Sequence, residues 1–207
     1  MENRSRWEAR TSRPSRAAAA MLLLVLPGLT ACDERSGTDP VASAPTNGPV
    51  IFQGAKIVQR AGMETDAGRQ VLFGALVVEN QGDEPATLQS AQLVGEVDSS
   101  AASVEEVRVR DLGEAPGGGD IVGATKWPNP EYEELWRTSV PIDDAELEPG
   151  HAAALMFIIE VNKTGDWYWP KSSLDYDVAG EQFSALTNFG FQVCPPAPAE
   201  CSPLDTS

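Results

Sequence analysis

The sequence predicts an all-β fold, an antiparallel β-sandwich of about seven or eight strands within residues 50–194. Three observations support this prediction. In several segments apolar residues recur with a period of two, the spacing of a strand with one buried face. Two further segments are almost continuously apolar, which indicates central strands covered on both sides. Glycine, proline and acidic clusters separate the segments at short intervals, as expected of turns.

The alternating segments predict strands with one solvated face. In 183–193 six positions of one face carry Phe, Ala, Thr or Val, and only Leu186 breaks the alternation. Segment 174–178 alternates apolar residues with aspartates, and Val107 and Val109 alternate with charged neighbours. Each of these segments is therefore expected to be half-buried.

The two continuous apolar segments, 71–78 and 155–161, predict the central strands of the sandwich. One helical turn is expected at 130–137. Further strands are expected at 50–58, 87–97 and around 138–142, with turns at 80–83, 113–120, 149–150 and 180–181.

Two stretches carry a resemblance to a known class of domain. Segment 75–88, with its turn Asn80-Gln81-Gly82, and the turn Leu147-Glu148-Pro149-Gly150 resemble bacterial immunoglobulin-like adhesion and transport-accessory domains. The resemblance implies an immunoglobulin-like sandwich that binds or spaces rather than catalyses. The first turn is also similar to a hairpin of the periplasmic copper chaperones, cupredoxin-like sandwiches. Those proteins use several Met and His ligands, and here Met63, Met156 and His151 form no evident set, so no metal and no cofactor are predicted.

The first 32 residues carry the most specific signal for location. Five arginines precede an apolar run at 17–26, which is typical of a signal peptide and too short for a transmembrane span. The run ends in Leu29-Thr30-Ala31-Cys32, which resembles the lipobox of bacterial lipoproteins. The resemblance implies cleavage of residues 1–31 and acylation of Cys32, with palmitate among the acyl chains. Ordinary secretion after an Ala-type cleavage site and an uncleaved anchor are the alternatives.

A flexible linker is predicted at 32–49 because the segment is rich in Ser, Thr, Ala, Gly and Pro. The chain has a formal charge of -16, and removal of residues 1–31, which carry five Arg and two Glu, leaves -19. Such an acidic protein is not expected to bind nucleic acid. Its contact with the membrane is therefore expected through the lipid alone.

Cys194 and Cys201 are the two cysteines left if Cys32 is acylated. An even pair in an oxidising compartment predicts a disulfide at the end of the domain, beside a proline-rich tail at 195–207. A metal pair or a redox motif is the alternative, although six residues separate the two cysteines and redox motifs use two.

Catalytic motifs are not evident in the sequence, and its one histidine, His151, follows a turn glycine. The chain is therefore predicted not to be an enzyme. The remaining chemistry is aromatic: Trp167 and Trp169 beside one turn, and Trp127 and Trp136 beside a proline-containing segment. Tryptophans in loops of a sandwich stack on sugar rings or anchor protein contacts. The alternative is that these rings close the open end of the core.

The favoured function is a lipid-anchored, non-catalytic binding or interaction module on the extracytoplasmic face of the cell membrane. Its partner is an unidentified protein or glycan. A structural spacer is one alternative, and a carbohydrate or cell-wall binder that uses the tryptophans is another.

Overall fold

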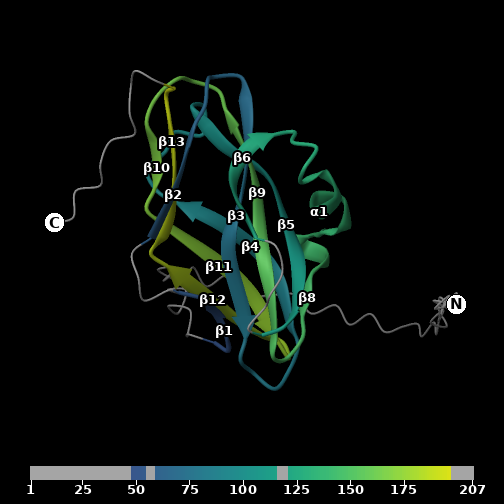
Figure 1. Ribbon diagram of the computed structural model, residues 1–207. Coiled ribbons are helices and arrows are strands. Elements are labelled where there is room, and N and C mark those ends of the chain that lie inside the picture. Colours follow the sequence, from purple (N-terminus) through teal and green to yellow (C-terminus); the bar gives the residue numbers. More distant parts are fainter. Residues whose placement is uncertain (1–47, 55–58, 116–120, 197–207) are drawn as a thin grey trace, which may run out of the picture. The chain divides into compact units, whose positions relative to one another are not determined.

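The computed structural model describes residues 48–54, 59–115 and 121–196. These residues form thirteen strands, one short α-helix and a 3₁₀ turn at Ile142–Asp144 (Figure 1). Within them no helix is long and apolar enough to cross a membrane. The segment predicted to be a signal peptide (1–31), most of the predicted linker (32–49) and the end of the predicted tail (195–207) lie outside the described residues, so their roles stay predictions.

The first layer is a six-stranded sheet built around β3 and β9. Both are almost continuously buried, because their apolar side chains point alternately to the two faces of the sheet and both faces are covered. The strand order is β1-β3-β9-β5-β7. Strands β1 and β6 pair with the same edge of β3, β6 near the beginning of β3 and β1 near its end. The strands are β1 (Val50–Phe52), β3 (Arg69–Asn80), β5 (Ala102–Glu114), β6 (Val122–Trp127), β7 (Val140–Pro141) and β9 (His151–Val161).

The second layer consists of two smaller sheets. One has the order β12-β11-β4-β8 and the other β10-β13-β2. Among the described residues all strand pairs are antiparallel except β13 with β2, which is parallel. The strands are β2 (Gln59–Glu64), β4 (Ala86–Val94), β8 (Glu146–Leu147), β10 (Trp167–Trp169), β11 (Lys171–Val178), β12 (Glu181–Thr187) and β13 (Phe189–Cys194).

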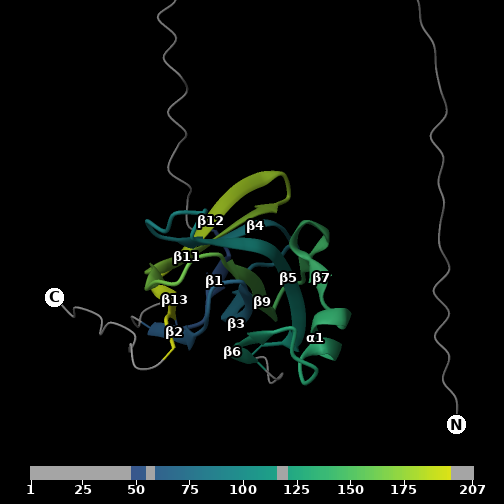
Figure 2. The ribbon, with the colours of Figure 1, turned by 90° about the horizontal axis from the view of Figure 1, so that it is seen from above.

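The main core lies between these two layers. Figure 2 shows β4, β11 and β12 on one side of β3, β5 and β9. Phe73 stacks on Phe157 of the neighbouring strand and on Phe191 of the opposite layer, with ring centroids 6.0 and 4.5 Å apart. Tyr176 is fully buried, and its hydroxyl accepts a hydrogen bond of 3.1 Å from the Val50 backbone N–H. The aromatic contacts therefore join the layers directly.

A second, smaller cluster covers the outer face of the six-stranded sheet. Leu72, Val122, Met156 and Ile158 are buried there, on the face of β3 and β9 that points away from the main core. The segment from β6 through helix α1 (Glu133–Thr138) packs over them with Trp127, Tyr132, Leu135 and Trp136. This segment shields one sheet face from water.

Asn80 connects the two turns that carried the immunoglobulin-like resemblance. Its buried side chain accepts a hydrogen bond from the Gly82 N–H and donates to the carbonyl oxygens of Glu84 and Leu147, each at 2.9 Å. The backbone N–H of Gly150, at φ +74°, donates to the Asn80 carbonyl at 2.8 Å. One side chain therefore fixes the two turns against each other.

The predicted all-β sandwich is confirmed, and the central strands at 71–78 and 155–161 lie where the apolar runs placed them. Thirteen strands are present instead of seven or eight, because β2, β6, β8 and β10 lie outside the predicted segments and segment 183–193 forms two strands. The helical turn expected at 130–137 is present as α1.

The prediction of a single strand at 183–193 is wrong. It forms two strands, β12 and β13, that belong to different sheets. The break occurs at Asn188, where the Thr187 hydroxyl accepts the N–H of Phe189 at 3.1 Å. The side-chain alternation continues through the break, and the period of two therefore hid it.

Candidate functional site

The tryptophans near residue 168 belong to the body of the sandwich. Trp169 is 5% exposed, lies in the main core and stacks on Phe191 with ring centroids 6.3 Å apart. Trp167 is half-buried, packs against the same core and donates from its indole Nε1 to the Lys163 carbonyl at 2.9 Å. Trp169 is therefore a core residue and not a ligand contact as predicted, because its ring is enclosed.

Trp127 and Trp136 come together on the outer face of the six-stranded sheet. Trp127 ends β6 and Trp136 lies in α1, and their ring centroids are 5.2 Å apart with the planes inclined by 50°. Both rings are half-buried. They therefore cover the small cluster with one side while part of each ring is open to solvent.

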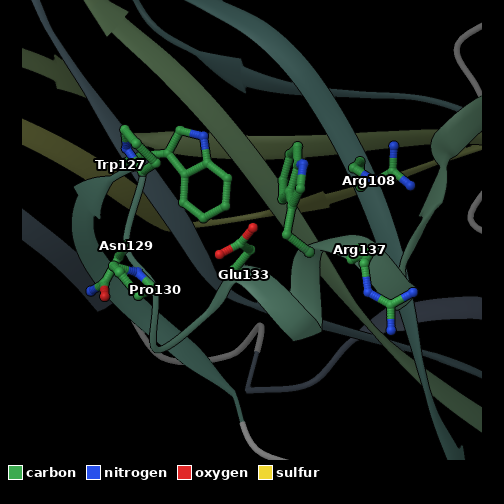
Figure 3. A pocket seen from close by; sticks show the side chains of 8 residues that line it. Arg108, Trp127, Asn129, Pro130, Glu133 and Arg137 are labelled. Carbon is green, nitrogen blue, oxygen red and sulfur yellow. The ribbon is translucent and has the colours of Figure 1, made fainter.

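A pocket of about 650 Å³ lies at this pair, a size that suits a small ligand. Figure 3 shows the residues that line it. They come from β5, from the end of β6, from the turn after it and from α1: Arg108, Trp127, Pro128, Asn129, Pro130, Glu133, Trp136 and Arg137. We call this the tryptophan pocket.

The turn before α1 holds the pocket wall in place. The Asn129 side chain donates to the Thr125 hydroxyl at 2.8 Å and accepts the Glu131 N–H at 3.1 Å. The Tyr132 N–H donates to the Asn129 carbonyl at 3.0 Å. The Asn129 side chain therefore ties the turn to the end of β6 through its amide nitrogen and stabilises the turn itself through its amide oxygen.

Arg108 lies on β5 and packs beside Trp136 of α1. Its guanidinium carbon lies 5.4 Å from the centroid of the ring, within the range of a cation–π contact. The guanidinium also donates to the Ser139 hydroxyl at 2.9 Å and to the Glu106 carboxylate at 3.1 Å. The Arg108 guanidinium is therefore held by a hydroxyl, by a carboxylate and by the Trp136 ring.

The two carboxylates of α1 have different environments. Glu134 accepts two hydrogen bonds from Arg137, at 2.6 and 3.0 Å, and these lower its pKa. Glu133 lines the pocket and is exposed, and it forms no hydrogen bond or ion pair with any described residue. Figure 3 shows the Glu133 carboxylate turned toward the Trp127 indole and Arg137 turned away.

The sequence predicted two of these residues as ligand contacts and missed the charged ones. Glu133 precedes Trp136 by three positions, which places both side chains on one side of a helix, so the spacing could have indicated it. Arg108 lies on a distant strand, and no local pattern marks it.

The other residues that the sequence offered as metal ligands or catalytic groups do not come together. His151 Nδ1 on β9 lies 3.4 Å from Asp111 Oδ1 on the neighbouring strand β5, and among the described residues no three His, Cys, Asp or Glu side chains lie close enough to hold a metal ion. Met156 lies in the outer cluster, whereas Met63 packs against the main core. A cavity of about 570 Å³ between β4 and β5 is lined mainly by residues of those two strands.

Cys194 ends β13 and is fully buried, with its Sγ 3.9 Å from the Met63 carbonyl oxygen. Its predicted partner Cys201 lies outside the described residues, as does Cys32. The disulfide and the lipidation therefore remain predictions.

Comparison with protein-family models and with curated proteins found no match. Solved structures give distant likenesses. A Vibrio cholerae VesB protease is 11% identical over 70% of this chain and 32% of its own, with a TM-score of 0.36. The chain therefore spans about a third of that protease. A PapD-like domain of human CEP192 is 15% identical over 84% of this chain and 100% of its own, also at 0.36. The C-terminal domain of a Streptococcus agalactiae antigen I/II polypeptide, BspA, is 14% identical over 72% and 50%, at 0.26. None of these TM-scores supports an argument about function.

Proposed function

We propose that the chain is a lipid-anchored, extracytoplasmic and non-catalytic binding module, and that it contacts its partner through the tryptophan pocket. The observation that carries the proposal is the placement of Trp127 and Trp136. Two half-buried indoles line a pocket of about 650 Å³ on an outer sheet face, whereas the other described aromatic pairs lie in the main core. Partly exposed tryptophans that line a pocket are typical of contact sites.

Anchoring through Cys32 is supported by the lipobox resemblance and by the short apolar run before it. Two acyl chains hold a protein stably on a membrane, whereas a single chain does not. Cells that make the native protein or its Cys32→Ala variant are fractionated. The variant should leave the membrane fraction, and equal retention of both forms would contradict the anchor.

The binding site is tested by placing a photo-crosslinking residue at Arg137, which lines the pocket and has a side chain 69% exposed. Leu186 on β12 is 57% exposed and does not line the pocket, so it serves as the control position. Irradiation of intact cells should give a discrete adduct from position 137, and this adduct should disappear when Trp136→Ala is added. Position 186 should not give it.

Equal adducts from both positions, or an adduct that persists without Trp136, would contradict the pocket as the contact site. That result would favour the structural spacer, in which Trp127 and Trp136 only close the outer face of the sheet.

A further inference from the structure

We propose that the tryptophan pocket binds the cationic head of an alkylammonium ligand, held against the indoles of Trp127 and Trp136 with Glu133 as its counter-ion. This inference rests on the proposed function and names the ligand class of the same site. Two properties of the pocket lead to it: the partly exposed indoles and the balance of its charges.

The indoles offer the surface that an organic cation prefers. The face of a tryptophan ring carries negative charge density and attracts an ammonium or guanidinium group within about 6 Å of its centroid. Arg108 already makes this contact with Trp136, at 5.4 Å. Trp127 has no such cation above its ring among the described residues. The inclined pair therefore leaves aromatic surface for a second cation.

The charges around the pocket leave one carboxylate without a partner. Arg108 is paired with Glu106 and Arg137 with Glu134, at 3.1 and 2.6 Å. Glu133 is the lining residue that remains, and its carboxylate is turned toward the Trp127 indole (Figure 3). The formal charge of the whole chain, -16, adds a general attraction for cations.

The same contacts disfavour an anion. Arg108 and Arg137 are each paired with a carboxylate, and an anionic ligand would also face the unpaired carboxylate of Glu133. A neutral sugar has no charge for Glu133 to pair with and would reach this carboxylate only through hydroxyl hydrogen bonds.

The test titrates the full mature chain, in non-ionic detergent, with choline and with its neutral isostere 3,3-dimethylbutan-1-ol. The two probes have the same shape and differ in one charge. Binding is followed by the indole N–H resonances of Trp127 and Trp136. Choline should shift both resonances and bind about 5- to 30-fold more tightly than the alcohol, the range expected of a cation–π contact with partial desolvation.

Two variants separate the counter-ion from general charge. Glu133→Gln should weaken choline about 3- to 5-fold, the upper end of the range for an exposed ion pair, and leave the alcohol unchanged. Glu131→Gln removes the same charge two residues away, from a side chain that does not line the pocket, and should change choline binding by less than about twofold because exposed charges are screened.

Equal binding of choline and the alcohol, or an unchanged affinity in Glu133→Gln, would overturn the inference. A soluble saccharide that shifts the same resonances, and does so equally in Glu133→Gln, would also overturn it in favour of a glycan. In each case a crosslink from position 137 that depends on Trp136 leaves the proposed function standing, so the two failures are distinguishable.

Discussion

Two Trp-Pro pairs occupy opposite environments in this molecule. Trp127-Pro128 ends β6 and Trp169-Pro170 ends β10, so both rings stand at the end of a strand just before a proline. Trp169 is 5% exposed and stacks on Phe191 in the main core, whereas Trp127 is half-buried and lines the pocket. The two environments differ because β6 and β10 belong to different sheets. The last residue of β10 packs in the main core, whereas the last residue of β6 packs on the outer cluster.

Of the two Trp-Pro rings, only Trp127 has aromatic surface open to solvent. In the main core the rings are enclosed by the two layers, and their function is stability. On the outer face a single short segment covers the sheet, and its rings therefore remain partly exposed.

Removal of the two rings should have unequal effects on stability. Trp169→Ala should lower the free energy of unfolding by about 3–5 kcal/mol, because it leaves a cavity in a packed core. Trp127→Ala should cost less than about 2 kcal/mol, because the site opens to solvent. Urea unfolding of each single variant against wild type measures both. Losses of several kcal/mol in both variants would mean that Trp127 is also a core residue.

Tyr176→Phe should destabilise the main core by about 1–3 kcal/mol, since it leaves the buried Val50 N–H without its acceptor. Burial raises the pKa of Tyr176, which therefore ionises at a higher pH in the folded chain than in the unfolded one, where the value is about 10. This stabilisation is complete below pH 10 and is lost as pH rises through the folded pKa.

Urea midpoints measured from pH 8 upward test this prediction. The wild type should lose more stability above pH 10 than Tyr176→Phe does, and Trp127→Ala should follow the wild-type pH curve. Parallel curves for wild type and Tyr176→Phe would show that Tyr176 does not couple to pH.

The contact between Trp127 and Trp136 should give a measurable coupling. A double-mutant cycle of the two Trp→Ala variants should yield about 0.5–1.5 kcal/mol, the range of an aromatic pair beyond its buried area. A second cycle with Trp127 and Trp169 should give no coupling, because these rings lie in separate clusters. Strictly additive losses in the first cycle would show that the pair does not interact in solution.

Glu133→Gln should leave the free energy of unfolding within about 0.5 kcal/mol of wild type, since the exposed carboxylate has no partner among the described residues. Thermal unfolding of this variant beside Glu131→Gln provides the measurement. A large loss in Glu133→Gln would mean that the carboxylate has a structural role, and its change in ligand affinity would then need another explanation.

The pattern of the sequence predicted much of the sandwich because side-chain period and turn chemistry are local properties. The apolar runs placed β3 and β9, and the turn at Asn80 and Gly82 matched its expected place. Strands β2 and β6 escaped notice because their residues, QRAGME and VGATKW, mix polar and apolar types without a clear alternation.

The sequence by itself determined the fold class, the central strands and the presence of aromatic candidates, because each depends on neighbours within a few positions. Only the tertiary structure decided which aromatic group is exposed. Trp169 faces the core because β10 pairs with β13 in the second layer, and Trp136 meets Trp127 and Arg108 because the segment after β6 folds back over β3 and β9. Such contacts depend on strand pairing between distant segments, and the side-chain period is the same on either face of a sheet.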